Sequence, residues 1–464
     1  MRGSGTRWLA LSAVGSLLAA ACAGGGGGTA APSAPAGGGG GGGSPAASAP
    51  GGGDGSPAPS APGSAPASDP APTGEIGGTV SVIGTWGGDE EESFLAMVEP
   101  FETETGIDVQ YTGTRDLEAV LTTGTASGIL PDLAGLPGPG QMTQFARDGH
   151  LVDLSTVIDQ AAYTESTAPA FVELGTVDDM LAGVFIKSAV KGLIWYNTGV
   201  FDAEPPATWE DLQAIAAEPA QQPWCVALES GPDSGWPATD WIEDIVLRQS
   251  GPEVYDQWVA GELAWTSPEI RSAFETFGEV LESSFGGADF AINTNFGQGG
   301  NPLFTDPPGC LFHHQASFIT DFFANEAGAT PEQYDFFPFP DIDPEYAGAL
   351  TGAGDLFGMF NDTPQSRALM EYLVTAEAQQ IWVDRGGALS ANIEVTEYPD
   401  EIAERSAAAL REAEIFRFDG GDQMPGQMNS AFFAAMVQFT QNPGDLDSIL
   451  ASLDETQAAA YGTE

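Results

Sequence analysis

Short alternating segments and longer helical segments follow one another along most of this chain. The segment 79–86 alternates valine with small or polar residues, which predicts a strand. The segment 91–105 then carries apolar residues at helical spacing, namely Phe94, Met97, Val98 and Phe101. A second alternating strand is predicted at 107–111. This β-loop-α-β unit predicts an α/β fold with largely parallel sheets.

The same alternation continues downstream. Further strands are predicted at 131–136, 192–197, 224–228, 310–313 and 356–360. Thr208 and Ser267 are suitable N-caps for helices, and Thr363-Pro364 predicts the start of one long helix that reaches Arg385. No short-period repeat or heptad pattern is present in the sequence.

The N-terminus has the pattern of an export signal rather than of a folded element. Arg2 and Arg7 precede an apolar run at 8–18, which is too short to span a bilayer. Small residues then lead to Cys22, as in a bacterial lipobox, so we expect 1–21 to be a lipoprotein signal peptide and Cys22 to be lipidated. The alternative is an ordinary secretory signal with an incidental cysteine.

Residues 22–75 consist almost entirely of Gly, Ala, Pro and Ser and contain no aromatic residue. Such a segment cannot bury apolar surface, so we expect a disordered tether. A tether behind a lipid anchor would hold the domain 76–464 near a membrane and leave it free to sample the space above.

The charge balance excludes several partners. The chain has 13 Lys and Arg against 66 Asp and Glu, which gives a formal net charge of −53. Nucleic acid and anionic membrane surfaces would be repelled, because binding to them requires basic side chains. Single acidic residues therefore carry little functional information here. The two lysines, Lys187 and Lys191, are more informative because they lie in one short segment.

Two cysteines lie in the predicted folded region. In an oxidising compartment Cys225 and Cys310 are expected to form a disulfide, and two unrelated buried thiols are the alternative. His313 and His314 lack a second pair at metal-ligand spacing, so no metal site is predicted there. Because neighbouring residues of a strand face opposite sides, we expect one of these histidines to be buried and the other exposed.

Several local patterns in a characteristic order resemble family 1 extracellular solute-binding proteins, the sugar-binding subunits of ABC importers. The resemblance is strongest to the alpha-glucoside-binding members and covers the chain from about Ile76 to its end. The segments that carry it are 80–109, 183–201, 206–212, 234–244, 352–362, 386–392, 416–426 and 429–436. The positions of the two cysteines also match those that such proteins commonly pair.

The resemblance implies a two-lobe α/β fold of the periplasmic-binding-protein type (type II), with hinge strands and a ligand cleft between the lobes. Lobe 1 would hold about 76–188 and 352–386, and lobe 2 about 193–350 and 390–464. The chain would cross between the lobes near 188–192, near 350–352 and near 387–390.

A sugar site needs aromatic faces for the ring and charged or amide groups for the hydroxyls. The residues predicted to bind ligand on this basis are Trp86, Asp89, Arg115, Lys187, Trp236, Asp240, Asp355 and Asp419. Each has a structural alternative: packing for the tryptophans, and ion pairing, turn formation or helix capping for the charged residues. Asp422 and Phe433 are weaker candidates for the same site.

The expected function is therefore capture of a sugar by a monomeric, lipid-anchored, extracytoplasmic protein that delivers it to ABC permease subunits. No catalytic residue and no cofactor is predicted, because the folded region has no GxSxG, P-loop or HExxH motif. A lipid-anchored glycoside hydrolase, which would need a suitably spaced carboxylate pair, is one alternative. A sugar sensor or adhesin on the cell surface is the other.

Overall fold

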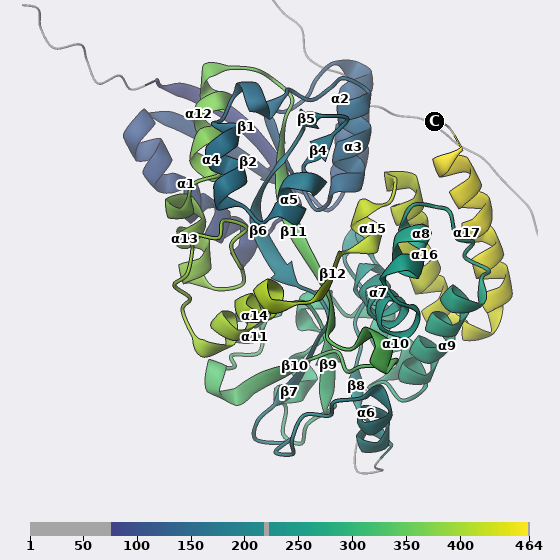
Figure 1. Cartoon of the computed structure of the whole chain (residues 1–464). Coiled ribbons are helices and arrows are strands. Elements are labelled where there is room, and N and C mark those ends of the chain that lie inside the picture. The colour runs from purple at the N-terminus through teal and green to yellow at the C-terminus, as the bar shows by residue number, and fades with distance from the viewer. Residues whose placement is uncertain (1–75, 218–221, 463–464) are drawn as a thin grey trace, which may run out of the picture. The chain divides into compact units, whose positions relative to one another are not determined.

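The computed structural model describes residues 76–217 and 222–462. They form two lobes, each built around its own sheet (Figure 1). The strands of the first sheet are β1 (Gly78–Gly84), β2 (Ile107–Gly113), β3 (Leu133–Leu136), β6 (Val184–Val190), β11 (Ala349–Met359) and β12 (Ile415–Phe418). The strands of the second sheet are β7 (Leu193–Asn197), β8 (Trp224–Cys225), β9 (Phe312–His314) and β10 (Tyr334–Pro338). A small ribbon pairs β4 (Thr176–Val177) with β5 (Met180–Leu181).

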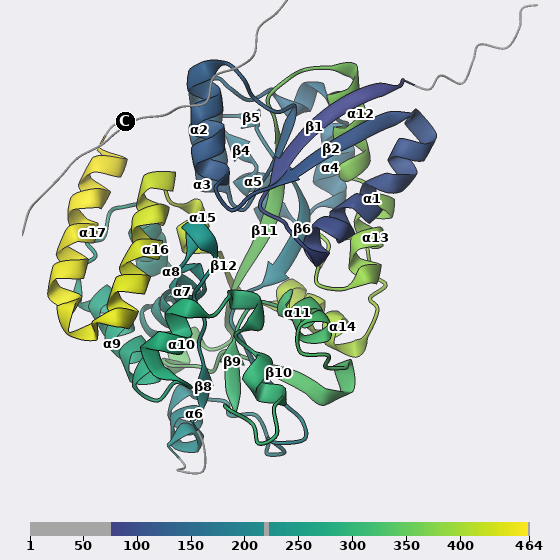
Figure 2. The ribbon, with the colours of Figure 1, turned by 180° about the vertical axis from the view of Figure 1, so that it is seen from behind.

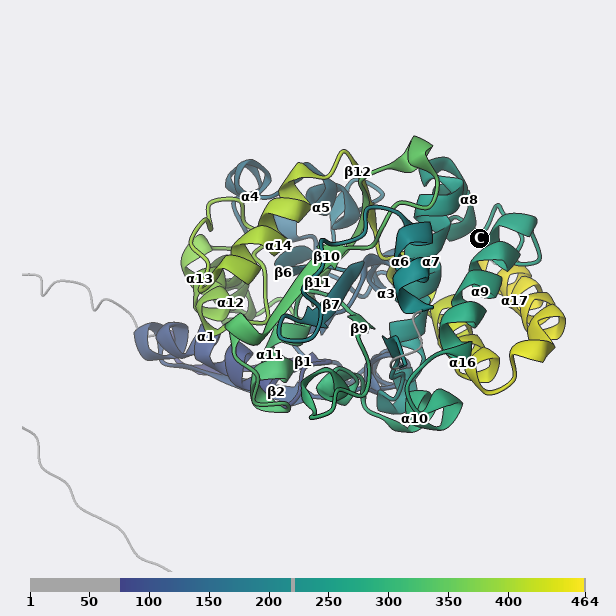
Figure 3. The same cartoon turned by 90° about the horizontal axis from the view of Figure 1, so that it is seen from below.

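Helices cover both sheets. Those near the first sheet are α1 (Asp89–Thr105), α2 (Leu117–Ser127), α3 (Pro139–Arg147), α4 (Gln160–Ser166), α5 (Pro169–Leu174), α12 (Pro364–Leu373) and α13 (Ala376–Arg385). The others are α6 (Trp209–Ala216), α7 (Trp236–Ser250), α8 (Pro252–Val259), α9 (Pro268–Glu282), α10 (Gly287–Asn293), α11 (Ile319–Asn325), α14 (Glu401–Glu412), α15 (Gly420–Gln423), α16 (Gly426–Gln441) and α17 (Leu446–Tyr461). Figure 3 shows α9, α16 and α17 gathered on one side of the second lobe.

Each sheet is buried on both faces. In β1, Val80 and Val82 face the core beneath α1, whereas Ile83 faces a separate core with α2 and α3. In β7, Ile194 belongs to one core and Trp195 to another. This two-sided burial explains why 193–196 is apolar throughout rather than alternating.

The predicted α/β class is confirmed, but the prediction of largely parallel sheets is wrong. β1 runs parallel to β2 and β3, and β11 runs parallel to β12. However, β11 is antiparallel to β3 and β6, and β7 is antiparallel to β9 and β10. The sheets are mixed because β6 and β11, which run between the lobes (Figure 2), traverse the first sheet in opposite directions.

The single long helix predicted up to Arg385 is also wrong. It is divided into α12 and α13, because the Thr375 side chain accepts a hydrogen bond from the Ala378 amide and so caps a new helix. The other N-cap predictions are confirmed: Thr208 caps α6 and Ser267 caps α9 through their side-chain oxygens.

The prediction that one histidine of the pair is exposed is wrong, since His313 is 2% exposed and His314 is 3% exposed. They do face opposite sides of β9, but both sides are covered. His313 Nδ1 lies 2.9 Å from the Cys225 carbonyl oxygen, and burial lowers the pKa of His313 to about 4. His314 Nε2 lies 2.7 Å from Oδ2 of Asp244, and its ring packs on Trp241.

A buried polar cluster holds the passage between β6 and β7. The carboxylate of Asp244 in α7 accepts hydrogen bonds from Arg248 and from Thr351 of β11, and it also contacts His314. Gly192 lies directly against it, because a Cβ at this position would be 2.5 Å from Asp244 Oδ1. The connection between the sheets is therefore held in place by the hydrogen-bonded Asp244 carboxylate, which can pack this closely because Gly192 has no side chain.

The predicted disulfide is confirmed: Cys225 of β8 is bonded to Cys310, with the Cα atoms 5.6 Å apart. Among the helices of the described residues, none is long and apolar enough to cross a bilayer. The predicted signal peptide, Cys22 and the tether lie outside the described residues.

Candidate ligand-binding site

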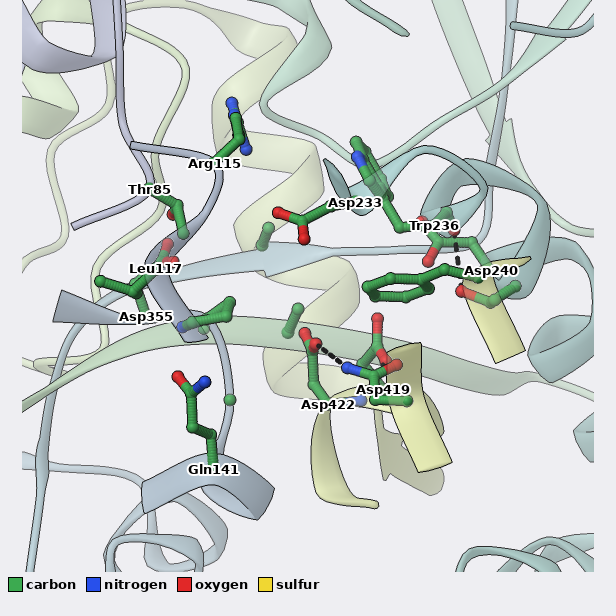
Figure 4. A pocket seen from close by; sticks show the side chains of 18 of the residues that line it. Thr85, Arg115, Leu117, Gln141, Asp233, Trp236, Asp240, Asp355, Asp419 and Asp422 are labelled. Carbon is green, nitrogen blue, oxygen red and sulfur yellow. Dashed lines mark hydrogen bonds between the residues drawn. The ribbon is translucent and has the colours of Figure 1, made fainter. Parts of the chain in front are cut away.

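A pocket lies between the two lobes and takes residues from both, as Figure 4 shows in close view. Its volume is about 170 Å³, well above the roughly 10–15 Å³ that a single water needs, so the pocket has room for several waters or for a small organic ligand.

The floor of the pocket comes from the end of β6 and from β11. In an extended segment every second residue faces the same side, and Lys187, Ala189 and Lys191 all line the pocket. Ala353 and Asp355 of the neighbouring β11 line it for the same reason. The short side chain of Ala189 separates two lysines that turn toward different lobes.

The Lys187 cluster, which we define as Lys187, Arg115, Glu90 and Asp355, lies on the side of the first lobe. Lys187 is 4% exposed, and its Nζ lies 2.8 Å from Glu90 and 3.6 Å from Asp355. Arg115 lies 3.6 Å from Glu90. Two cations and two carboxylates thus meet in one group in which the charges balance; Lys187 and Glu90 are buried, whereas Arg115 and Asp355 are partly exposed.

The Lys191 cluster, which we define as Lys191, Asp240, Asp419, Asp422 and Glu243, lies on the side of the second lobe. Lys191 Nζ lies 3.0 Å from Asp240 and 2.9 Å from Asp419. Glu243, 1% exposed, accepts hydrogen bonds from the backbone amides of Gly420 and Gly421 in α15. Its neighbours Asp240 and Asp419 lie close enough for one oxygen of each of the three carboxylates to fall within 4.8 Å of the others. This cluster has one cation for four carboxylates.

The electrostatics of the two clusters differ accordingly. Burial alone would raise the pKa of Glu90, but the charges of Lys187 and Arg115 hold it below its ordinary value. Burial raises the pKa of Asp240 to about 7, and the like charge of Asp419 adds to the rise. Lys191 opposes it, but the same ammonium also pairs with Asp419. Burial and the charges of Asp419 and Asp240 also raise the pKa of Glu243 well above its ordinary value.

Tryptophan rings lie next to both lysines of the pocket. Lys191 Nζ lies 4.9 Å from the ring centroid of Trp236, and Lys187 Nζ lies 5.9 Å from that of Trp86. Trp86 is only 2% exposed and packs among Phe94 and Trp382, so most of its surface belongs to the core. Trp236 is less buried, and its indole Nε1 is buried without a hydrogen-bond partner among the described residues.

The structure brings most of the predicted site residues into this pocket. Those that line it are Trp86, Arg115, Lys187, Trp236, Asp240, Asp355 and Asp419. Asp89 does not line it, and the next residue, Glu90, does. Asp89 and Glu90 both lie in the first turn of α1, where successive side chains are rotated by about 100°.

Three further carboxylates line the pocket that were not predicted from the sequence: Glu90, Glu118 and Asp233. Glu90 stands in an acidic run and Asp233 in a polar turn, so neither had a local signal. Asp422, which was weighed only as a weaker candidate, also lines it, as does Phe433. The period-two spacing of Lys187 and Lys191 was the one available signal that both lysines face the same space.

This fold and pocket define a two-lobe binding protein, and the comparisons identify its family. Residues 96–409 match the family of bacterial extracellular solute-binding proteins, and the chain belongs to that family. The resemblance inferred from the sequence is confirmed.

Two similar proteins cover most of the chain. The osmoprotective compounds-binding protein GgtB of Synechocystis sp. is 38% identical over 78% of this chain and 88% of its own. The alpha-glucosides-binding periplasmic protein AglE of Rhizobium meliloti is 35% identical over 80% of this chain and 85% of its own.

Solved structures agree with the fold. The bacterial solute receptor AcbH, described as preferring β-D-galactopyranose, gives a TM-score of 0.72 at 19% identity and covers 83% of this chain and 99% of its own. A chitin oligosaccharide binding protein gives a TM-score of 0.71 at 17% identity over 83% of this chain and 99% of its own. At these identities the likeness extends to the two-lobe fold alone.

Proposed function

We propose that this protein is the extracytoplasmic substrate-binding subunit of an ABC importer and that its ligand is a sugar, with alpha-glucosides as the preferred class. The observation that carries the proposal is the pocket between the lobes, in which buried charged groups and aromatic rings face one space. The names of GgtB and AglE support an organic osmolyte or glucoside as ligand. Another relative, from Pyrococcus horikoshii, is named as an ABC transporter extracellular-binding protein.

The pocket chemistry suits a polyhydroxylated ligand. Asp240, Asp355 and Asp419 offer oxygens that accept hydrogen bonds from hydroxyls, and charged acceptors make the stronger bonds. The Trp236 ring offers a flat apolar face for C–H groups. A ligand held between the lobes would therefore bind through both its rim and its ring face.

Capture would proceed by closure of lobe 1 (76–188 and 352–386) on lobe 2 (193–350 and 390–464), and the closed form would dock on the permease subunits. In this division β12 lies at the crossing between the lobes, where it pairs with residues 349–352 of β11. Contacts across the pocket support this division. Ser430 of α16 donates to Glu118 of α2 at 3.0 Å, and the Arg115 guanidinium lies 5.1 Å from the centroid of the Phe296 ring.

We propose further that the protein is a monomer held at the membrane by a lipid on Cys22, with the segment 22–75 as tether. Radiolabelled palmitate fed to expressing bacteria should enter the wild type and not the Cys22→Ser variant. Equal labelling of both would contradict the anchor.

The relatives are named binding proteins, and we propose that this protein binds sugar without turnover. Incubation with maltotriose should leave the sugar intact. Release of glucose or maltose by a sample free of other hydrolases would favour the glycoside hydrolase instead.

Isothermal titration calorimetry of the purified protein against maltose, trehalose and sucrose tests the function, with xylose as the non-glucoside comparison. We expect a saturable one-to-one signal with at least one alpha-glucoside. Trp236→Ala should weaken it by on the order of 100-fold, since the large apolar face of a stacked tryptophan ring is lost. The matched control is Glu455→Gln, in an exposed position of α17 far from the pocket. Absence of any signal from a folded sample would overturn the alpha-glucoside proposal.

A further inference from the structure

All three cations that line the pocket are already paired with carboxylates of the protein. Lys187 lies 2.8 Å from Glu90, Arg115 lies 3.6 Å from the same side chain, and Lys191 lies 2.9 Å from Asp419. A ligand carboxylate or phosphate would have to compete with these pairs, because no unpaired Lys or Arg lines the described pocket. The two buried lysines therefore offer little to an anionic ligand, and Arg115, whose side chain is about a third exposed, is the one cation of the described pocket that such a ligand could reach without displacing a short ion pair.

Carboxylates, in contrast, are present in excess. Seven line the pocket: Glu90, Glu118, Asp233, Asp240, Asp355, Asp419 and Asp422. Within the described residues, Asp233 and Asp422 form no ion pair. The Asp422 side chain accepts one hydrogen bond, from Asn429 Nδ2 at 3.5 Å, and Figure 4 shows Asp233 and Asp422 reaching into the same space from different elements.

The pKa values of Asp233 and Asp422 are both raised, because no paired cation among the described residues offsets their burial. Burial raises the pKa of Asp233 to about 6, with Glu118 and Asp116 adding to the rise and Arg115 opposing it. Burial raises the pKa of Asp422 well above its ordinary value, with contributions from Asp419, Asp240 and Asp355 against a single opposing charge, Lys191. A cation that bound beside either carboxylate would stabilise its charged form.

We propose that the pocket selects its ligands by charge: it accepts neutral glycosides, binds glycosides that carry an amine more tightly, and rejects acid sugars. This inference rests on the proposed sugar-binding function and adds the class of substituent that the site prefers. The physical reason is that an ammonium group supplies the countercharge that Asp233 and Asp422 lack, with charge-assisted hydrogen bonds. A ligand carboxylate would instead be buried among like charges without a cation of its own.

Calorimetry with a matched set of ligands tests the proposal. The set is trehalose, the four monoamino trehaloses with the amine at position 2, 3, 4 or 6, and the mono-uronic acid of trehalose. At pH 7 we expect at least one amine to bind on the order of tenfold more tightly than trehalose, and the uronic acid at least tenfold more weakly. Repeating the amine titration in buffers of different ionisation enthalpy should also reveal proton release, since the ammonium displaces protons from the carboxylates.

The double variant Asp233→Asn and Asp422→Asn removes the charges and keeps the shapes. It should lose the amine preference and the proton release, whereas Glu455→Gln should keep both. If trehalose binds and every amine binds equally or more weakly, charge selection is overturned and the sugar-binding function stands. If neither trehalose nor any amine binds a folded sample, both proposals fail together. A double variant that unfolds leaves the ligand series on the wild type as the deciding measurement.

Discussion

The Lys187 cluster and the Lys191 cluster occupy equivalent places on the two sides of one pocket, yet their charge balance differs. Lys187 and Arg115 share two carboxylates, whereas Lys191 alone faces four. Both lysines are buried and both stand over a tryptophan ring. Lys187 therefore completes a group of zero net charge. Lys191 does not, and the remaining carboxylates around it need protons or a ligand to balance their charge.

The largest effect should come from removing the single cation of the Lys191 cluster. Lys191→Met would leave Asp240 and Asp419 buried without a partner, and breaking a buried ion pair costs about 3–5 kcal/mol. Urea unfolding at pH 7 would measure the loss. A loss below about 1 kcal/mol would mean that the ion pairs of Lys191 contribute little to stability.

The corresponding change in the Lys187 cluster should cost less. Lys187→Met removes a charged hydrogen bond worth about 1.5–3 kcal/mol, but Arg115 remains 3.6 Å from Glu90 and continues to offset its charge. The same unfolding experiment, run beside Lys191→Met and the Glu455→Gln control, tests the order. If Lys187→Met proved the more damaging, the contrast between the clusters would be wrong.

The clusters should also titrate in opposite directions. The folded pKa of Asp240, about 7, exceeds its ordinary value of 3.8, so its contribution to stability falls as pH rises from about 4 to 7. The folded pKa of Glu90 lies below its ordinary value of 4.5, so its contribution is present above that pH and is lost as pH falls.

Asp240→Asn should therefore gain stability relative to the wild type as pH rises from 4 to 7, by at most about 1.4 kcal/mol per pH unit. Glu90→Gln should show no such gain over this range. Unfolding free energies at pH 4, 5, 6 and 7 would measure both, and parallel curves for wild type and Asp240→Asn would contradict the assigned titration.

The smallest effect concerns the contact that joins the two sides. Glu118→Gln keeps the shape of the side chain that accepts from Ser430, so the charge-assisted bond becomes a neutral one, at a cost of about 0.5–1 kcal/mol. We expect ligand affinity to fall about two- to fivefold with unfolding free energy nearly unchanged. An equal loss in both measurements would indicate a structural role within one lobe.

Some secondary-structure elements could be predicted from the sequence and others could not. The strand 79–86, the stripe of apolar residues in α1 and the N-caps Thr208 and Ser267 were all predictable, because they depend on neighbours within one turn or one strand. The break at Thr375 was not, because a cap inside a helical stretch is visible only in its hydrogen bond to Ala378.

The site was predicted in part for the same reason. Tryptophans and lysines are rare enough in this chain to be informative, and Trp236, Lys187 and Arg115 do line the pocket. Carboxylates are so common that local pattern could not separate Asp89, which does not line the pocket, from Glu90, which does.

The sequence by itself determined the α/β class and many of the strands and helices, favoured the pairing of the two cysteines and identified the family to which the chain belongs. Only the tertiary structure decided which carboxylates meet which lysine: Glu90 is 97 positions from Lys187, and Asp240 is 49 positions from Lys191. The physical reason is that secondary structure depends on neighbours along the chain, whereas the energy and the protonation of a buried charge depend on distance and burial in space.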